Sequence, residues 1–300
     1  MITRLEDLAA RVRAAGRKYR IAVAWAHDTN TVGALKRASD EGFIEPLMTG
    51  DPGIIGKMAS EAGFGPTDFR IIEAGNESAA ATAAVSLTRS GEADIVMKGL
   101  VGTDKFLKAV MDKETGILPP KAVMTYVCAV EIPAYHKLLF ITDPAVIPFP
   151  DLDQKIAMAN YAIGMAEKFG IDNPKVALVG ASEKVSRHFE NSIDYSVMCK
   201  MADRGQIRKC VMDGPLDIML ACDPESVEIK GVPTPVGGDA DILLFPNLES
   251  CNPFYKGLML FGGGELAGII CGPTKPVVVM SRSESEKSKY YCISLACLMV

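Results

Sequence analysis

Short apolar runs alternate with longer amphipathic segments along most of the chain. The first four apolar runs are predicted strands, over 20–25, 46–49, 69–73 and 94–97. The segments between and after them are predicted helices, over 30–42, 52–63, 76–91 and 103–114. Three of these helices end at Gly42, Gly63 and Gly91, and glycine is the usual left-handed stop of a helix. Buried strands that alternate with amphipathic helices are typical of a mostly parallel sheet covered on both faces.

The rhythm changes in the middle of the chain. Residues 122–132 and 137–142 read as two strands with only four residues between them. That connection is too short for a crossover helix, so we expect an antiparallel pair. The alternation then resumes, with strands predicted over 175–179, 210–212, 241–245, 268–271 and 276–280. The matching helices are predicted over 151–170, 191–205, 252–262 and 284–300, and the segment 217–231 is predicted to contain helix.

This organisation predicts two α/β domains. Residues 1–132 and 274–300 are expected to form a first, discontinuous domain, because the last strand and helix can return to the first half. Residues 133–273 are expected to form the second. A chain of 300 residues lies at the length where one core begins to split into two.

Composition excludes several classes of protein. With 48% hydrophobic residues the chain is not intrinsically disordered. A net charge of -5 argues against a general nucleic-acid binder, although a few local cations still suffice for a small anion. No run of eighteen apolar residues and no secretory leader is found, so no membrane partner is expected. Eight cysteines dispersed between Cys128 and Cys297 read as reduced thiols of a cytoplasmic protein.

The common cofactor motifs are missing. The segment 180–184 is too short for a phosphate-binding P-loop, and Trp25-Ala26-His27-Asp28 follows the first strand where a dinucleotide fold would have GxGxxG. HExxH, CxxC and GxSxG are also absent. We therefore expect no metal and no permanently bound cofactor.

Polar residues follow several predicted strands, at the edge where open α/β sheets bind ligands. They are Lys98, Asp143, Asp213, Asn247 and the pair Ser281-Arg282. Each has the alternative role of a loop residue or helix cap. The pair is the sharpest case, because a hydroxyl, a guanidinium and the free amides of the following helix would converge on one anion. In the alternative, Ser281 or Ser283 only caps that helix.

Residues 98–104 (KGLVGTD) form a second candidate site. Two glycines allow the backbone to approach a ligand, and Thr103 is placed to cap the next helix. Lys98, Lys105 and Lys108 add cations. The alternative is an ordinary glycine-rich connection with solvated lysines. A third polar turn, 235–241 (PVGGDAD), leads into a buried strand.

Four segments in this order resemble the phosphate acetyl/butyryl transferase family. They are 93–104 (ADIVMKGLVGTD), 201–215 (MADRGQIRKCVMDGP), 238–256 (GDADILLFPNLESCNPFYK) and 272–283 (GPTKPVVVMSRS). The segment 137–155 (KLLFITDPAVIPFPDLDQK) and the short length make the chain most similar to the butyryl branch.

The resemblance implies two doubly wound three-layer αβα domains with a cleft between them, an isocitrate/isopropylmalate dehydrogenase-like fold, and a homodimer. It implies the reaction acyl-CoA + phosphate ⇌ acyl phosphate + CoA by direct attack in a ternary complex, with coenzyme A as a substrate. Ser281 would position the thiol or acyl oxygen, and Arg282 would bind phosphate. The implied substrate-binding residues are Lys98, Gly99, Thr103, Lys108, Asp239, Asn247, Asn252 and Lys256.

Two positions depart from the acetyl branch. Lys108 stands where that branch has an arginine, which keeps the charge but loses the planar fork. Ser288 stands where it has an aspartate proposed as the base for the thiol. Glu284, Glu286 or a phosphate oxygen of the substrate are the alternatives for that base.

Other functions stay open at this stage. One is phosphate acetyltransferase, and another is a relative that binds CoA or phosphate without turnover. A decarboxylating dehydrogenase of similar fold would need a carboxylate metal cluster, which the sequence lacks. A ping-pong route through a cysteine is disfavoured because no cysteine has a base beside it in sequence.

Overall fold

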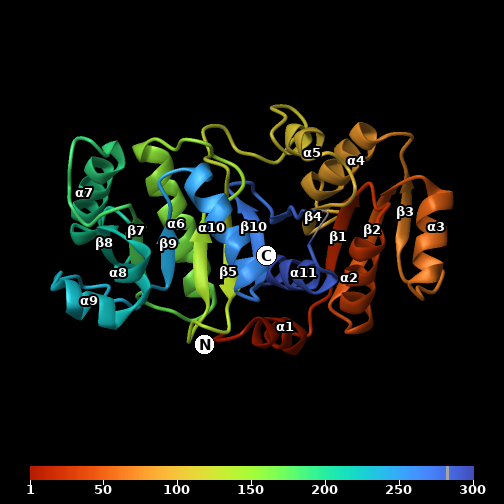
Figure 1. Cartoon of the computed structure of the whole chain (residues 1–300). Helices are drawn as coiled ribbons and strands as arrows, with labels where there is room; N and C mark the ends of the chain where they lie inside the picture. Colours follow the sequence, from red (N-terminus) through yellow and green to blue (C-terminus); the bar gives the residue numbers. More distant parts are fainter. Residues whose placement is uncertain (282–283) are drawn as a thin grey trace. The chain divides into compact units, whose positions relative to one another are not determined.

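The computed structural model describes residues 1–281 and 284–300 (Figure 1). The chain divides into two compact units. The N-terminal unit comprises Leu5–Met124 and Leu266–Val300, and the central unit comprises Met1–Arg4 and Thr125–Glu265. The division of the chain into domains after residues 132 and 273 stays a prediction. That these units are independent folding domains stays a prediction.

The N-terminal unit alternates strands and helices as the sequence pattern predicts. Its strands are β1 (Tyr19–Ala24), β2 (Ile44–Gly50), β3 (Arg70–Glu73), β4 (Ile95–Lys98), β10 (Glu265–Cys271, whose first residue is assigned to the central unit) and β11 (Val277–Val278). Its helices are α1 (Leu5–Ala14), α2 (Thr29–Asp40), α3 (Pro52–Glu61), α4 (Glu77–Arg89), α5 (Thr103–Val110) and α11 (Glu286–Met299).

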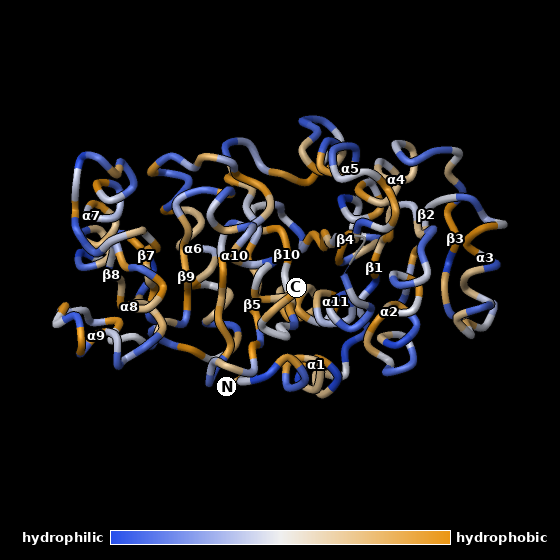
Figure 2. Tube along the Cα trace, viewed as in Figure 1, coloured by the Kyte–Doolittle hydropathy of each residue, from blue (hydrophilic) through white to orange (hydrophobic). Residues whose placement is uncertain are grey.

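The strands of this unit follow the order β3-β2-β1-β4-β11-β10. All neighbours are parallel except β10, which is antiparallel to β11. β1 and β4 are buried almost throughout, and Figure 2 shows hydrophobic residues concentrated along the strands. The α/β class predicted from the hydrophobic pattern is confirmed.

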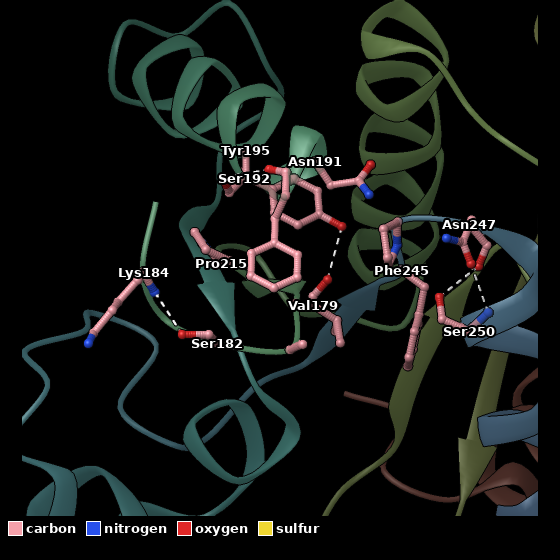
Figure 3. A pocket seen from close by; sticks show the side chains of 14 residues that line it. Val179, Ser182, Lys184, Asn191, Ser192, Tyr195, Pro215, Phe245, Asn247 and Ser250 are labelled. Atoms are coloured by element: carbon pink, nitrogen blue, oxygen red, sulfur yellow. Dashed lines mark hydrogen bonds between the residues drawn. The ribbon is translucent and has the colours of Figure 1, made fainter. Parts of the chain in front are cut away.

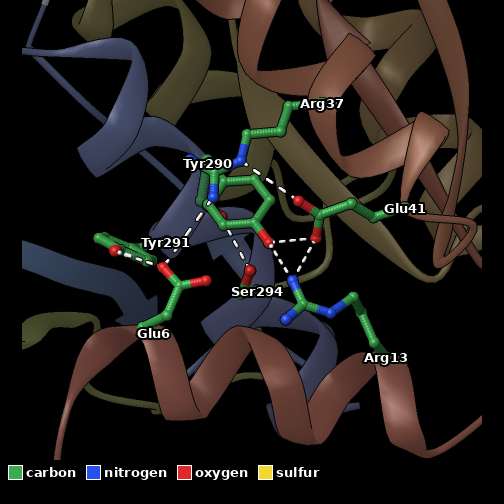
Figure 4. Close-up of polar contacts among 7 residues, drawn as sticks. All are labelled: Glu6, Arg13, Arg37, Glu41, Tyr290, Tyr291 and Ser294. Atoms are coloured by element: carbon green, nitrogen blue, oxygen red, sulfur yellow. Dashed lines mark hydrogen bonds and ion pairs between the residues drawn. The ribbon is translucent and has the colours of Figure 1, made fainter.

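A polar cluster joins three helices of this unit (Figure 4). The carboxylate of Glu41, which follows α2, accepts hydrogen bonds from Arg13 of α1 (2.5 Å) and from the hydroxyl of Tyr290 of α11. The guanidinium of Arg37 lies 3.8 Å from the centroid of the Tyr290 ring. Burial alone would raise the pKa of Glu41, but the hydrogen bonds from Tyr290 and Arg13 outweigh it and lower the pKa.

Replacement of Glu41 by glutamine is expected to destabilise the protein by about 1–2 kcal/mol at pH 7, because charged hydrogen bonds are lost. A carboxyl group with a lowered folded-state pKa stabilises the fold above its unfolded pKa of about 4.3 and loses that contribution as the pH falls through the folded-state value. Urea unfolding between pH 7 and pH 3 should therefore show a shallower acid loss in Glu41→Gln than in wild type. Glu61→Gln, which removes a loose exposed pair, serves as the control; equal acid slopes in wild type and Glu41→Gln would contradict the assignment.

The central unit begins with the predicted antiparallel pair. Its strands are β5 (Thr125–Glu131), β6 (Leu139–Thr142), β7 (Lys175–Val179), β8 (Val211–Leu216) and β9 (Ile242–Leu244). Its helices are α6 (Leu152–Lys168), α7 (Glu190–Asp203), α8 (Ile218–Cys222), α9 (Pro224–Lys230) and α10 (Leu248–Phe261). The order is β5-β6-β9-β7-β8, with β5 antiparallel to β6 and the other neighbours parallel.

Residues 217–231 contain helix as predicted, in two short pieces, because Pro224 opens a new helix that Asp223 caps. Two other details of the prediction were wrong. α10 begins four residues earlier than predicted and contains Pro253 inside it. β8 extends to Leu216, so Asp213 lies within a strand and not after one.

All eight cysteines lie outside disulfides. Among the described helices, none is both long enough and apolar enough to cross a membrane.

Candidate functional site

The carboxyl ends of β1, β4 and β11 lie at one edge of the N-terminal unit, because these strands are parallel neighbours. Trp25 follows β1, the turn 98–104 includes the end of β4, and Ser281 stands three residues after β11. The structure therefore brings the 98–104 turn and Ser281 to the same edge of one sheet, as the sequence analysis expected.

The turn after β4 is held closely against β1. The amide of Gly99 donates to the carbonyl of Ala24 and that of Leu100 to the carbonyl of Trp25, both at 2.9 Å. A Cβ on Gly99 would lie 2.5 Å from the Trp25 oxygen and 2.7 Å from that of Ala24. Only glycine fits here, because both of these oxygens belong to the backbone.

Lys98 is 4% exposed, and its Nζ donates to the carbonyls of Gly99 and Val101, each at 3.1 Å. Its ammonium thus supports the turn from inside. At the other end, Gly102 is the N-cap of α5 and Thr103 is its first residue, so the prediction that Thr103 caps the helix was wrong. Thr103 and Lys108 are both exposed.

An aromatic pair that the sequence analysis did not assign to the site lies at the same edge. Trp25 has a φ of 57°, a left-handed conformation that costs a bulky residue about 1–3 kcal/mol. Its ring centroid lies 3.9 Å from that of His27. His27 Nε2 accepts a hydrogen bond from the amide of Asp51 at 3.0 Å, so this nitrogen carries no proton. Burial lowers the pKa of His27. The nearby charge of Asp51 acts in the opposite direction but is the smaller effect, so the pKa lies below its ordinary value.

Acidification is expected to quench the fluorescence of Trp25, the single tryptophan of the chain. An imidazolium in contact with an indole accepts charge from the excited ring. Because the pKa of His27 is lowered, the midpoint should lie below the ordinary value of about 6.5. The neutral form of His27 therefore stabilises the fold above its unfolded-state pKa of about 6.5. This contribution is lost as the pH falls through the lower folded-state pKa. Emission recorded between pH 8 and pH 5 tests this; His27→Gln should abolish the titration, and a midpoint above 6.5 would refute it.

The predicted Ser281-Arg282 pair is only partly described. Ser281 is exposed, whereas Arg282 and Ser283 lie outside the described residues. α11 begins at Glu286, and its N-cap is Ser285, whose hydroxyl accepts from the amide of Ser288 at 3.0 Å. The alternative in which Ser281 caps this helix was therefore wrong.

The start of α11 is anchored to α2. Lys289 is 4% exposed, and its Nζ lies 3.0 Å from Oδ1 of Asp28, the N-cap of α2. Glu286 packs closely against Gly33 of α2. A Cβ atom added to Gly33 would lie only 2.6 Å from Oε2 of Glu286. Ser288, at the position of the acetyl-branch aspartate, is 2% exposed.

In the central unit, Asn247 and Asp143 follow the parallel neighbours β9 and β6. Asn247 Oδ1 accepts from the amide of Ser250 at 2.8 Å and so caps α10, which was the alternative for this residue. Asn252 Nδ2 donates to the carbonyl of Pro144 at 2.8 Å, and Lys256 is exposed.

Asp239 lies at the opposite, amino-terminal edge of the same strands. Its carboxylate is 2.9 Å from the Nζ of both Lys137, which precedes β6, and Lys175, which begins β7. Burial would raise the pKa of Asp239, but the bonds from these lysines outweigh it and lower the pKa. The structure thus gives Asp239 a partner set within its own unit, and its role in substrate binding stays a prediction.

A pocket of about 390 Å³ opens at the carboxyl ends of β7 and β9 (Figure 3). Val179 and Phe245, at these strand ends, line it together with Asn247 and with Phe189 and Asn191 at the start of α7. Asn191 was not singled out from the sequence, since nothing local distinguishes it from other helix-start residues.

Within residues 1–281 and 284–300, no group of three or more His, Cys, Asp or Glu residues is arranged to hold a metal ion.

A family model described as phosphate acetyl/butaryl transferase matches residues 68–297. The chain belongs to this family. Phosphate butyryltransferase of Clostridium acetobutylicum is 38% identical over 299 residues, 100% of this chain and 99% of that protein. Phosphate acetyltransferase of Thermotoga maritima is 35% identical over 97% of this chain and 98% of that protein. A branched-chain phosphotransacylase structure from Enterococcus faecalis V583 has a TM-score of 0.81 at 29% identity, covering 93% of this chain and 98% of that one.

The resemblance inferred from the sequence is thus confirmed. The match to the phosphate acetyl/butaryl transferase family spans every site residue named from the sequence, from Lys98 to Arg282. Trp25 and His27 precede the matched region. The family pattern could therefore not have indicated this aromatic pair. The one signal for it in the sequence was that Trp25 is the single tryptophan of the chain.

Proposed function

We propose that this protein is a phosphate butyryltransferase-type acyltransferase that catalyses acyl-CoA + phosphate = acyl phosphate + CoA with a short acyl chain. The observation that carries the proposal is the full-length similarity to proteins named phosphate butyryltransferase, at 38% and 36% identity. The family match supports the same reaction class.

The chemistry is a direct displacement. In the direction of thioester synthesis, the sulfur of CoA attacks the carbonyl carbon of the acyl phosphate. A carbon–sulfur bond forms, the carbon–oxygen bond to phosphate breaks, and phosphate leaves with the electron pair. Holding both substrates together removes the entropic cost of a two-body encounter. We assign Arg282 to the phosphate and Ser281 to the acyl oxygen or thiol. The assignment of Ser281 is supported by its position after β11, at the same sheet edge as the 98–104 turn that follows β4.

The thiol proton needs an acceptor. Ser288 is 2% exposed and lies in the first turn of α11, so it is no substitute for the aspartate of the acetyl branch. Glu286 contacts α2 at Gly33. We propose that an oxygen of the departing phosphate takes the proton, which needs no further residue, with Glu284 as the alternative acceptor.

A route through an acyl-cysteine is disfavoured by the state of the thiols. Burial raises the pKa of Cys199 to about 12 and the pKa of Cys210 and Cys222 to about 11. Burial also raises the pKa of Cys251 and Cys297. A protonated thiol is a poor nucleophile, so direct transfer between the substrates is the better mechanism.

We also propose the finer fold description, an isocitrate/isopropylmalate dehydrogenase-like arrangement of two doubly wound three-layer αβα domains. The order β3-β2-β1-β4 in the N-terminal unit supports it. A homodimer is proposed from the family resemblance alone. A cytoplasmic location is proposed because eight cysteines without a disulfide suit a reducing compartment.

The test is phosphate-dependent release of CoA from butyryl-CoA, followed with a thiol reagent. Ser281→Ala and Arg282→Ala should each lose at least about tenfold in rate, whereas Ser60→Ala, an exposed serine of α3, should not. Comparison of acetyl-, propionyl-, butyryl- and isobutyryl-CoA distinguishes the butyryl from the acetyl activity. Binding of CoA without turnover of any of them would instead identify a non-catalytic relative.

A further inference from the structure

A buried ion pair joins the start of α11 to the start of α2. Lys289, the fourth residue of α11, is 4% exposed, and its Nζ donates to Oδ1 of Asp28 at 3.0 Å and to the hydroxyl of Thr31 at 3.3 Å. The same Oδ1 also accepts from the amide of Thr31 at 2.8 Å and so caps α2. One carboxylate therefore begins α2 and holds α11.

This pair supplies geometry more than stability. Burial alone would raise the pKa of Asp28, but the hydrogen bonds from Thr31 and Lys289 outweigh it and lower the pKa, so Asp28 is ionised at neutral pH. The cost of removing two charges from water offsets most of their attraction, and two neutral side chains of similar size often stabilise a fold as well. Such side chains pack without a preferred direction, whereas an ammonium bonded to two fixed oxygens holds its helix in one position.

Asp28 is tied to the 98–104 turn through the short segment 25–28. The carbonyl of Trp25, three residues before Asp28, accepts from the amide of Leu100 at 2.9 Å. Between them, His27 Nε2 accepts from the amide of Asp51 at 3.0 Å. The segment is thus bonded to the turn at one end and to α11 at the other.

α11 also determines where Ser281 lies. The sulfur of Cys292 in α11 lies 3.1 Å from that of Met280, the residue before Ser281. On the other side, the carbonyl of Ser281 accepts from the amide of Glu284 at 3.3 Å, one residue before Ser285 caps the helix. A shift of α11 would therefore move Ser281 with it.

We propose that Asp28 and Lys289 are a positioning pair for the acyl transfer, which holds Ser281 in register with the 98–104 turn. The inference rests on the proposed function, which assigns Ser281 to the acyl oxygen or thiol. Neither member of the pair needs to touch a substrate, because both act through the elements that they join. Transfer between two bound substrates depends on such alignment, and a misplacement of about 1 Å can cost about 100-fold in rate.

A second polar contact between α11 and α2 offers a matched control (Figure 4). The hydroxyl of Tyr290, the residue after Lys289, donates to the carboxylate of Glu41. Glu41 is the C-cap of α2, so this contact lies at the other end of that helix from Asp28. It joins the same two helices away from the edge that carries the 98–104 turn.

The decisive variant removes both charges. Asp28→Asn alone keeps the α2 cap, because asparagine is a good N-cap, but leaves Lys289 charged and buried. It should lower the midpoint of urea unfolding by about 1 M. Asp28→Asn combined with Lys289→Met has no buried charge and should regain most of that shift. Its kcat for butyryl-CoA and phosphate should still be at least about tenfold lower, with each KM within about twofold of wild type.

Tyr290→Phe separates loss of stability from loss of alignment. It removes one hydrogen bond from Glu41, which keeps its bond with Arg13, and should lower the urea midpoint. Its kcat should stay within about twofold of wild type, because the contact is remote from the turn. If the ion pair only stabilised the fold, the double variant would instead regain kcat together with its stability.

Amide hydrogen exchange gives a readout that does not depend on turnover. The amides of Ser288 and Lys289 donate to the hydroxyl and the carbonyl of Ser285, at 3.0 and 3.1 Å. In the double variant, the protection of the amides at positions 288 and 289 should fall at least about tenfold, because the start of α11 is released. Tyr290→Phe should change it less than about twofold.

The outcomes separate this inference from the proposed function. Turnover by wild type together with an undiminished kcat in the double variant overturns the positioning role and leaves the function standing. Absence of turnover of every short acyl-CoA by wild type overturns the proposed function. In that case, reduced protection at 288 and 289 in the double variant still supports the pair as the device that fixes the start of α11, and unchanged protection overturns it.

Discussion

Replacement of Gly99 by alanine is expected to lower kcat/KM about 100-fold and to destabilise the protein by about 3 kcal/mol. The new methyl group would lie 2.5 Å from the carbonyl oxygen of Trp25 and 2.7 Å from that of Ala24. Neither oxygen can rotate away, because both belong to the backbone where β1 ends. Relief requires the 98–104 turn to move outward, and insertion of a methyl group into close-packed surroundings costs about 1–3 kcal/mol.

That movement also breaks hydrogen bonds. The amides of Gly99 and Leu100 would lose their 2.9 Å bonds to Ala24 and Trp25, at about 1 kcal/mol each. The turn holds Lys98 and leads into α5, so the proposed substrate contacts shift with it. A displacement of about 1 Å is enough to reduce a positioned reaction about 100-fold.

The measurement combines urea unfolding with turnover assayed at a temperature where the variant remains folded. Gly102→Ala, in the same turn, is the control for stability, because its Cβ would meet the end of the flexible Asp104 side chain, 2.7 Å away. It should cost less than about 1 kcal/mol, because alanine is a poorer N-cap of α5 than glycine but meets no backbone atom. Equal stability of the Gly99 and Gly102 variants would show that the turn is not held as described.

Replacement of Asp143 by asparagine is expected to destabilise the protein by about 3 kcal/mol, although the two side chains have nearly the same shape. Asp143 is 2% exposed and accepts four hydrogen bonds. The donors are the hydroxyl of Thr125, at 2.8 Å, and the amides of Ala145, Val146 and Ile147, at 2.8, 2.9 and 3.1 Å. These bonds shape the loop that follows β6.

An asparagine amide brings two donors of its own to a site where every neighbour already donates. At least one backbone amide loses its acceptor, and each buried group left unsatisfied costs about 1–3 kcal/mol, more where a charge was involved. Urea unfolding at pH 7 measures the difference. Asp172→Asn, an exposed aspartate of the same unit, should be nearly neutral; a similarly small effect at Asp143 would contradict this account.

Most secondary structure could be predicted because its signals are local. Apolar runs predicted the strands, and residues 175–179 coincide with β7. The four-residue connection after β5 predicted the antiparallel pair with β6. The errors fell where a cap decides the boundary. α10 begins at Leu248 because Asn247 caps it, whereas the pattern predicted a start at residue 252.

The candidate site was predictable only in part. The family segments identified the 98–104 turn and Ser281 as candidate site residues. The two follow β4 and β11, which are parallel neighbours, so both lie at one edge of the sheet. The direction of each side chain was not predictable. Lys98 turns its ammonium onto its own turn, and Asn247 uses its oxygen to cap α10. Such choices depend on which donors and acceptors tertiary packing places nearby.

The sequence by itself determined the α/β class and the family, since periodicity and motif order are properties of neighbouring residues. The need for glycine at position 99 came from the tertiary structure, because a Cβ there would meet the carbonyl oxygens of Ala24 and Trp25. Only the tertiary structure decided which residues share an edge. Asp239 and Asn247 are eight residues apart in the chain, yet lie at opposite ends of β9. Asn191 is oriented by Lys155, which is 36 residues away. The physical reason is that strand order and burial select the partners of a polar group, and no local pattern encodes that selection.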